Sequence, residues 1–269
     1  MDHAAMLALF DREQRVKVQY PDIRREARPH LVRHVHLAGR DGFVAYSRLR
    51  PEEVDAVISE QVAYFQSLGQ GFEWKVYDHD TPADLRERLA ARGFLAEEPE
   101  AVLVLNLQEA PPALLAPPAA DVRRVTDRAG IADILAVKAA VWGEDFTWLG
   151  DELTQQIEGS PEAVSLYVAY ADGQPCSTAR ICFHPGSQFA SLWGGSTLSA
   201  FRRRGLYTAL LAVRAQEALR RGCRFLTVDA SPMSRPILQR HGFQWLTNAQ
   251  AYTWPARRSG NPAPAGNVS

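Results

Sequence analysis

The stretch "SAFRRRGLYTALL", residues 199–211, places three successive arginines and a glycine directly before an apolar run with helical spacing. The first N–H groups of a helix have no partner within the helix, and the helix dipole makes that end positive. Glycine lets the backbone approach a phosphate closely, and arginine side chains add charge. The turn is therefore predicted to bind an anion, most simply a diphosphate. The alternative is that these arginines only form the solvated, basic start of a helix. The order of the surrounding helices and strands decides between the two interpretations.

Composition narrows the class of protein. The chain has 269 residues, of which 46% are hydrophobic and 23% charged, enough for one large domain or two ordinary ones. A formal net charge of -1 argues against a general attraction to nucleic acid or to an anionic membrane. The three cysteines, Cys176, Cys182 and Cys223, form no C-x-x-C pair, so we expect neither a zinc site nor a disulfide framework. With no long apolar run, we expect a cytoplasmic protein.

A proline-rich seam divides the chain. Residues 108–121, QEAPPALLAPPAAD, contain four prolines and no strand-like alternation, which is typical of a stiff, partly extended connector. We therefore predict a first domain over residues 1–107, a linker over 108–120 and a second domain over 121–254. Residues 255–269 are rich in proline, glycine and polar residues and are predicted to be disordered.

Hydrophobic periodicity predicts the element order βααβββαβαββ for the second domain. Asp172-Gly173 is a hairpin signal, Gly222 closes a long amphipathic helix, and Gly242 closes a short one. The expected elements are a strand at 121–125, helices at 126–142 and 147–158, two strands around residue 172, a strand at 189–199, a helix from 206, a strand at 223–230, a short helix, and a final pair of strands.

This order, with a strand running into Arg-x-x-Gly and then a helix, resembles the GCN5-related N-acetyltransferase (GNAT) superfamily over residues 121–254. The acetyl-CoA signature of that family, [Q/R]-x-x-G-x-[G/A], matches Arg202 to Gly205, but Tyr207 replaces the small residue. The resemblance implies an α/β (α+β) fold with a mixed, mostly antiparallel sheet flanked by helices.

The resemblance also assigns the acyl-CoA-binding residues. Backbone amides of the turn would hold the CoA pyrophosphate, the backbone before the turn would pair with the pantetheine arm, and Leu198 would polarise the thioester. The residues that this assignment includes are Thr197, Leu198, Ser199, Arg202, Arg203, Arg204, Gly205, Leu206, Tyr207 and Thr208.

A second family signature, N-x-x-A-x-x-L-Y-x-K-x-G-F, aligns with residues 231–243. The basic residue and the Gly-Phe end match, whereas Ser231 stands in the asparagine place and Leu238 in the place of a tyrosine that often protonates the departing thiolate. A CoA thiol can leave as thiolate near neutral pH, so the missing acid does not exclude catalysis. Ser231 is therefore kept as a candidate catalytic residue.

The sequence of the N-terminal half resembles a diverged copy of the C-terminal half. Asp80 precedes Gly93-Phe94 by the interval that separates Asp229 from Gly242-Phe243, and both pairs enclose a short helix. The alignment puts Leu49-Arg50-Pro51-Glu52 where the other copy has its basic turn. Proline removes an N–H donor, and glutamates repel an anionic ligand. The resemblance therefore extends to tandem GNAT proteins with a degenerate first copy.

The other candidate residues have two interpretations each. Asp229 could accept a proton from the acceptor amine or cap the helix that follows. Glu144 and Asp145 could bind the acceptor or be exposed loop acids, and Trp193 could face a cleft or the core. His79 lies between two aspartates, but neighbouring strand residues point to opposite faces, so no metal site is expected.

These observations predict an acyl-CoA-dependent N-acyltransferase that transfers acetyl from acetyl-CoA to a primary amine by direct attack in a ternary complex. The acceptor would be a small molecule, a peptide N-terminus or a lysine, and no nucleic acid or membrane partner is expected. The chain is expected to be a monomer or a homodimer. The alternative is a non-catalytic module that binds acyl-CoA as a sensor or structural partner. The sequence leaves the identity of the acceptor open.

Overall fold

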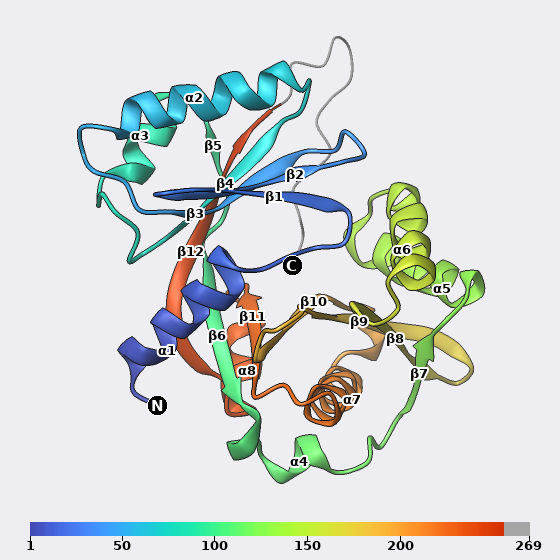
Figure 1. Cartoon of the computed structure of the whole chain (residues 1–269). Helices are drawn as coiled ribbons and strands as arrows, with labels where there is room; N and C mark the ends of the chain where they lie inside the picture. The colour runs from blue at the N-terminus through green and yellow to red at the C-terminus, as the bar shows by residue number, and fades with distance from the viewer. Residues whose placement is uncertain (256–269) are drawn as a thin grey trace. The chain divides into compact units, whose positions relative to one another are not determined.

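The computed structural model describes residues 1–255 and divides into two compact units (Figure 1). The first unit holds residues 1–102 together with 229–233 and 245–255, and the second holds residues 103–228 and 234–244. The last strand of the chain therefore completes the sheet of the first unit. The domain boundaries predicted from the sequence stay a prediction. The segment predicted to be disordered, after Pro255, lies outside the described residues.

The first unit is built on a sheet in the order β1-β2-β3-β4-β12, in which only β3 and β4 are parallel. The short strand β5 pairs with β12. The elements of this unit are α1 (His3–Phe10), η1 (Asp11–Val16), β1 (Ile23–Arg28), β2 (Leu31–His36), β3 (Gly42–Ser47), α2 (Val54–Ser67), β4 (Phe72–Tyr77), α3 (Leu85–Ala91), β5 (Leu95–Ala96) and β12 (Gln244–Trp254).

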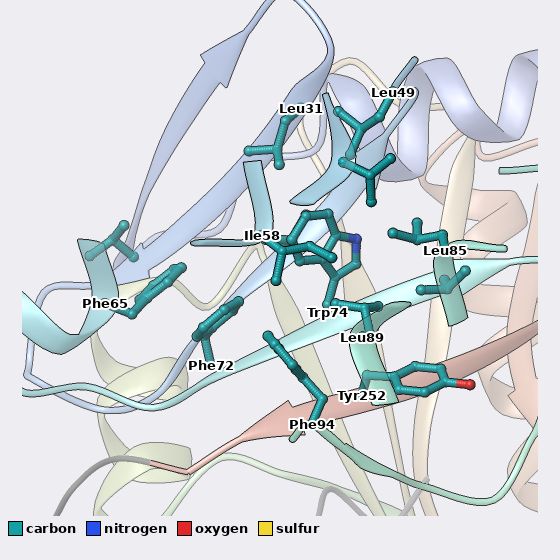
Figure 2. Packing of buried hydrophobic residues seen from close by; sticks show 14 residues of the cluster. Leu31, Leu49, Ile58, Phe65, Phe72, Trp74, Leu85, Leu89, Phe94 and Tyr252 are labelled. Atoms are coloured by element: carbon teal, nitrogen blue, oxygen red, sulfur yellow. The ribbon is translucent and has the colours of Figure 1, made fainter. Parts of the chain in front are cut away.

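The core of the first unit lies between its sheet and the helices α2 and α3 (Figure 2). Alternation along β4 turns Phe72 and Trp74 into this core, where the ring of Phe65 stacks on Phe72 at 4.4 Å. Glu73 and Lys75 therefore point to the other face of the sheet. Burial of the aromatic side chains is the main stabilising contribution to this unit.

The second unit has the sheet order β11-β10-β9-β8-β7, in which only β10 and β11 are parallel. Its elements are η2 (Leu107–Glu109), α4 (Pro112–Leu115), β7 (Asp121–Val125), α5 (Arg128–Trp142), α6 (Thr147–Gly159), β8 (Val164–Ala171), β9 (Gln174–Phe183), β10 (Phe189–Thr197), η3 (Ser199–Phe201), α7 (Leu206–Arg220) and α8 (Arg235–Arg240). The strands β6 (Glu100–Asn106), β11 (Phe225–Ala230) and β12 cross the boundary between the units. The mixed, mostly antiparallel α/β fold is as predicted.

The helices of the second unit cover opposite faces of its sheet. Leu166 of β8 packs in a core cluster with residues of α5 and α6, whereas Ser165 and Tyr167 beside it donate to Glu217 of α7, at 2.8 Å and 2.6 Å. Because successive strand residues face opposite sides, α5 and α6 lie on one face and α7 on the other (Figure 1).

Local signals in the sequence predict most of these elements. Asp127 caps α5 by accepting from the N–H of Gly130 at 2.9 Å, and Asp172 and Gly173 both have positive φ, as a tight hairpin turn requires. The predicted final pair of strands is wrong, because residues 244–254 form one continuous strand. The connector also differs from an extended chain: α4 packs on α7, where Gln216 Nε2 donates to the carbonyls of Leu114 and Ala116.

The ends of four helices support the internal duplication. Each helix is followed by a left-handed glycine and by an N–H that bonds back to the carbonyl five residues earlier, the Schellman arrangement. This pattern closes α2 with Gly69 and α7 with Gly222, and it closes α3 with Gly93 and α8 with Gly242. In the second pair, Phe94 bonds to Leu89 and Phe243 bonds to Leu238, both at 3.2 Å. Corresponding helices of the two copies thus end in the same way.

Candidate functional site

The neighbouring strands β10 and β11 pair over only part of their length. Their parallel register runs from Phe189 opposite Phe225 to Ser191 opposite Thr227. Strand β10 continues to Thr197 and stays paired with β9 to its end. In the described part of the chain, the other edge of β10 is not paired with β11 beyond Ser191. This edge can accept an extended ligand as if it were an added strand.

A bulge in β10 determines which backbone groups lie along that edge. The register with β9 shifts between Trp193 and Ser196, and Gly194 has φ +63. Beyond the bulge, the N–H of Leu198 donates to the carbonyl of Cys176 at 3.0 Å. Because hydrogen-bonding direction alternates along a strand, the N–H of Thr197 points to the opposite edge.

The alternation corrects one expectation from the sequence. The amide of Leu198 is engaged with β9 and is therefore not available to polarise a thioester, the role predicted for it. Thr197 presents its N–H group to the open edge instead. The side-chain hydroxyls of Thr197 and Ser177 are 2.6 Å apart. Side chains approach this closely at antiparallel pairs whose backbone groups do not hydrogen-bond to each other. The assignment of this segment to acyl-CoA stays a prediction, with Thr197 in place of Leu198 as the predicted donor.

The basic turn leads into α7 without a side-chain cap. Arg203 has φ +62, and Gly205, the N-cap residue, has φ +80 with no side-chain hydrogen bond. The first bond of the helix runs from the N–H of Ala209 to the carbonyl of Gly205 at 2.9 Å. The N–H groups of the three preceding residues therefore point out of the helix start, where the dipole favours an anion.

The three arginine side chains of the turn are exposed. Arg202 Nε donates to the carbonyl of Thr197 at 3.3 Å, and Arg204 lies 3.8 Å from Asp172 with both side chains at least half exposed. Exposed pairs of this kind contribute little to stability. The guanidinium groups are therefore free to turn toward a bound phosphate.

Tyr207 follows the glycine of the turn, and its ring lies against β10. A Cβ atom built on Gly195 would be 3.7 Å from Tyr207 Cε2, and burial raises the pKa of the Tyr207 hydroxyl. The aromatic ring thus extends toward the bulge. Beside it, the hydroxyl of Thr208 lies 3.1 Å from His241 Nε2. Burial, together with the nearby Arg240 charge, lowers the pKa of His241, so this imidazole is neutral at pH 7.

The face of the sheet that carries α5 and α6 holds a row of polar side chains next to the bulge. Trp193 is half-buried and donates from Nε1 to the hydroxyl of Ser191 at 2.9 Å. Trp142, the last residue of α5, donates from Nε1 to the hydroxyl of Ser196 at 3.1 Å. The sequence analysis included Trp193 but missed Trp142. No local signal in the sequence marked Trp142, because its partner Ser196 lies 54 positions away in the chain.

The predicted acceptor acids have different environments. Glu144 is exposed after the end of α5. Asp145 accepts from the N–H of Thr147, the first residue of α6, at 2.8 Å, and hydrogen bonds to Thr147 lower the pKa of this carboxyl. Asp145 therefore has a structural role at the start of a helix, and Glu144, Asp145 and Trp193 all remain predicted acceptor residues.

Asp229 lies in the first unit, in an ion pair that the sequence did not indicate. Lys75 Nζ is 2.6 Å from Asp229 Oδ2 and 3.4 Å from Glu100, with side chains only 16% and 13% exposed for Lys75 and Asp229. Burial lowers the pKa of Lys75, but Asp229 and the other nearby acids outweigh it and raise that pKa well above its usual value. The helix that Asp229 might have capped begins only at Arg235, so the capping interpretation is wrong.

The candidate residues therefore divide between the units. The residues assigned to acyl-CoA lie together in the second unit along β10 and α7, and Leu238, at the family's tyrosine place, is fully buried there. Asp229 and Ser231 fall in the first unit. Asp229 follows Thr227, the last β11 residue paired with β10, by two positions.

Within residues 1–255, no group of three or more His, Cys, Asp or Glu side chains is arranged to hold a metal ion. His79 instead contacts Asp11 at 3.0 Å and the hydroxyl of Thr247 at 3.2 Å. None of the described helices is long and apolar enough to span a membrane.

Known structures share this fold over most of the chain. A GCN5-related N-acetyltransferase from Kribbella flavida superposes with a TM-score of 0.65 at 17% identity, covering 93% of both chains. A conserved protein of unknown function from Staphylococcus epidermidis ATCC 12228 gives 0.66 at 16% identity over 88% of this chain and 96% of that chain. A tandem GNAT protein from the clavulanic acid biosynthesis pathway gives 0.57 at 14% identity over 91% and 86%. No curated protein matches the sequence.

The fold is thus that of acetyltransferase-like proteins, including a tandem one. The acetyltransferase (GNAT) family matches residues 131–243, the part that contains β8 to β11 and α7. The chain carries a GNAT-family domain, and the resemblance seen in its sequence is confirmed.

Proposed function

We propose that the protein is an acyl-CoA-dependent N-acyltransferase that transfers acetyl from acetyl-CoA to a primary amine. The observation that carries the proposal is the open edge of β10 after Ser191, which leads directly into the uncapped start of α7. A cosubstrate with an extended amide-containing arm and a diphosphate has the chemistry that these two neighbouring features bind.

The turn would hold the diphosphate through backbone N–H groups of residues 203–208. Gly205 supports this assignment, because a Cβ there would meet no protein atom within 4 Å and its φ of +80 favours glycine. The arginines of the turn, Arg202, Arg203 and Arg204, would add charge-assisted bonds. The pantetheine amides would pair with the open edge of β10.

Attack on the thioester would take place at the end of β10. The amine nitrogen would bond to the carbonyl carbon while the N–H of Thr197 stabilises the oxygen that becomes negative. The C–S bond would then break, and CoA would leave as thiolate. The proton lost by the amine would go to Asp229 or to water, and no covalent enzyme intermediate is required. Ser231 is kept as a candidate in this step because it aligns with a family signature position.

The acceptor would approach the face of the sheet that carries α5 and α6. Glu144, Asp145 and Trp193 are the predicted acceptor-binding residues, and Trp142, which donates to Ser196, adds a second aromatic side chain beside the bulge. A peptide N-terminus or lysine is a less favoured acceptor than a small molecule, because the row of small polar groups here is short.

A second candidate is a module that binds acyl-CoA without catalysis. The complete burial of Leu238 favours it, because no side-chain acid stands in the place where the family often has tyrosine. Both functions predict acetyl-CoA binding, so the decisive measurement is chemical. Acetyl-CoA affinity would be measured by calorimetry, and free CoA release would be followed with and without a panel of primary amines. Amine-dependent release supports the enzyme, whereas tight binding with no release from any amine supports the sensor.

A further inference from the structure

Within residues 1–255, two cations beside the bulge of β10 have no anionic partner. Lys138 of α5 is only 7% exposed, and its ammonium makes no hydrogen bond or ion pair with a described residue. It lies over the ring of Phe146, 4.9 Å away. The carboxylate of Asp133, an acid on the same helix, accepts a hydrogen bond from the hydroxyl of Tyr170 at 2.5 Å. An unpaired charge of this kind is costly to bury.

Arg180 of β9 is the second cation. Its Nε atom is buried without a hydrogen-bond partner, and its guanidinium lies 5.9 Å from the ring centre of Trp193. Burial, and then the charge of Arg180, lowers the pKa of Lys138 to about 8. The two positive groups thus lie near each other, partly desolvated, and flanked by the aromatic rings of Phe146 and Trp193. An anion that enters between them would stabilise such a pair.

The two cations lie on the acceptor face. Arg180 is paired with Trp193, and Cys182, two residues along β9 on the same side, packs against the cluster below α5 and α6. The next pair on this face is Thr178 with Ser196, the residue that receives the bond from Trp142. Lys138 and Trp142 are four residues apart on α5, so their side chains lie on the same face of that helix.

We propose that Lys138 and Arg180 bind an acidic group, a carboxylate or a phosphate, of the amine acceptor. The inference rests on the proposed function and narrows its substrate class. Arg180 and Thr178 are two positions apart on β9, a rise of about 7 Å. The acceptor is therefore a small molecule whose amine and acidic group lie roughly that far apart, as in a short ω-amino acid or a phosphorylated amino alcohol.

Matched acceptors test the charge requirement. Release of CoA from acetyl-CoA would be compared for γ-aminobutyrate against propylamine, β-alanine against ethylamine, and phosphoethanolamine against ethanolamine. Loss of a charge-assisted pair is expected to reduce kcat/KM by about tenfold or more for each uncharged amine. Preference for phosphoethanolamine identifies phosphate as the group, and preference for the amino acids identifies carboxylate. Equal or faster turnover of the uncharged amines overturns the inference.

Variants test whether these two cations are responsible. Lys138→Met and Arg180→Met should each remove the preference for acidic acceptors while leaving acetyl-CoA affinity unchanged. Arg128→Met removes the same charge from the exposed first turn of α5 and serves as the matched control. Lys138→Met should also be at least as stable as the parent, because an apolar chain of similar length replaces an unpaired buried charge. Retention of the preference in both variants overturns the inference.

A binding measurement separates the inference from the proposed function. The melting temperature would be recorded with saturating CoA, which occupies the basic turn, after addition of sodium phosphate or γ-aminobutyrate against sodium chloride at equal ionic strength. An increase of about 2 °C or more in the parent, absent from Lys138→Met, supports the anion site even if no amine is acetylated. Amine-dependent CoA release without that increase and without acidic preference leaves the enzyme proposal standing and overturns the anion site.

Discussion

Lys75 Nζ and Asp229 Oδ2 lie 2.6 Å apart, although the two residues are separated by 154 positions in the sequence. Asp229→Asn would leave Lys75 with Glu100 as its remaining close acid. Breaking a largely buried ion pair on one side is expected to lower the free energy of unfolding by about 2 kcal/mol. Chemical denaturation measures this loss.

The double variant Asp229→Asn/Lys75→Met separates stability from catalysis. Removing both charges should restore much of the stability, so that the two single losses are not additive. If Asp229 also takes the proton of the amine, turnover should be lower by about 10²-fold in both Asp229→Asn and the double variant. Normal turnover in the double variant removes Asp229 from the mechanism.

Glu73 makes the stability of the first unit depend on pH. Burial, with the nearby charges of Glu97, Glu100 and Asp229, raises the pKa of Glu73 to about 7, against an opposing effect of Lys75. The folded state therefore holds a proton that the unfolded state loses, and this group makes stability fall as pH rises from about 4.5 to about 7. Above pH 7 the ionised Glu73 costs up to about 3 kcal/mol.

Glu73→Gln should remove this dependence. At pH 8 the variant is expected to be more stable than the parent by as much as about 3 kcal/mol, and at pH 4.5 the two should be nearly equal. Urea unfolding at several pH values measures the difference. Glu98→Gln, a change at an exposed residue close by, is the control and should show no comparable gain. Parallel pH curves for parent and Glu73→Gln would contradict the assignment.

The features predicted well from sequence are those determined by short-range interactions. Helix ends at Gly222 and Gly242 and the cap at Asp127 follow from residues within one turn of the chain. The basic turn was identified because its residues are contiguous. The duplication was visible because both copies keep the same spacing from aspartate to Gly-Phe.

The features that the sequence did not reveal depend on pairing between distant residues. The single long strand at 244–254 pairs with β4, far away in the chain, so no local signal marked it. The direction of the Leu198 amide depends on a bulge four residues earlier in β10, and one added residue reverses which edge each N–H faces. The sequence analysis did not single out Lys138 or Arg180, because their shared environment depends on the packing of α5 on β9.

Gly205 tests the basic turn. Gly205→Glu should abolish acetyl-CoA binding, because a carboxylate would enter the space expected for the diphosphate. Gly222→Glu is a matched control at the other end of α7: its φ is +78, close to the +80 of Gly205, and a Cβ at either glycine would have no protein atom within 4 Å. Both changes should cost similar stability, about 1 kcal/mol, from the left-handed backbone. Equal acetyl-CoA affinity of the two variants by calorimetry would remove the site from the turn.

The first unit should not bind a second acyl-CoA. At the corresponding helix start, Pro51 lacks an N–H, and Arg50 is paired with Glu53 and lies 3.6 Å from Glu52. The positive charge there is already matched within the chain. Calorimetry with acetyl-CoA should give one site per chain, and a stoichiometry near two would show that this helix start retains an anion site.

Thr197 should be the backbone donor that polarises the thioester. Thr197→Pro removes its N–H without removing a bond to β9, because that N–H faces the open edge, where a strand tolerates proline. Loss of one such donor is expected to lower kcat by about 10² to 10³-fold. Thr197→Ala keeps the N–H and removes only the hydroxyl contact with Ser177, so it should retain most of the activity.

Leu198→Pro is the opposing test. The backbone of Leu198 has a φ of −53, which already suits proline. This change removes the bond from the Leu198 N–H to Cys176 and should cost about 1 kcal/mol of stability, with kcat nearly preserved. Steady-state kinetics on the three variants, each checked for folding by thermal denaturation, distinguishes the two donors. If Leu198→Pro loses turnover and Thr197→Pro retains it, the thioester is polarised at Leu198, and the donor derived from the bulge is wrong.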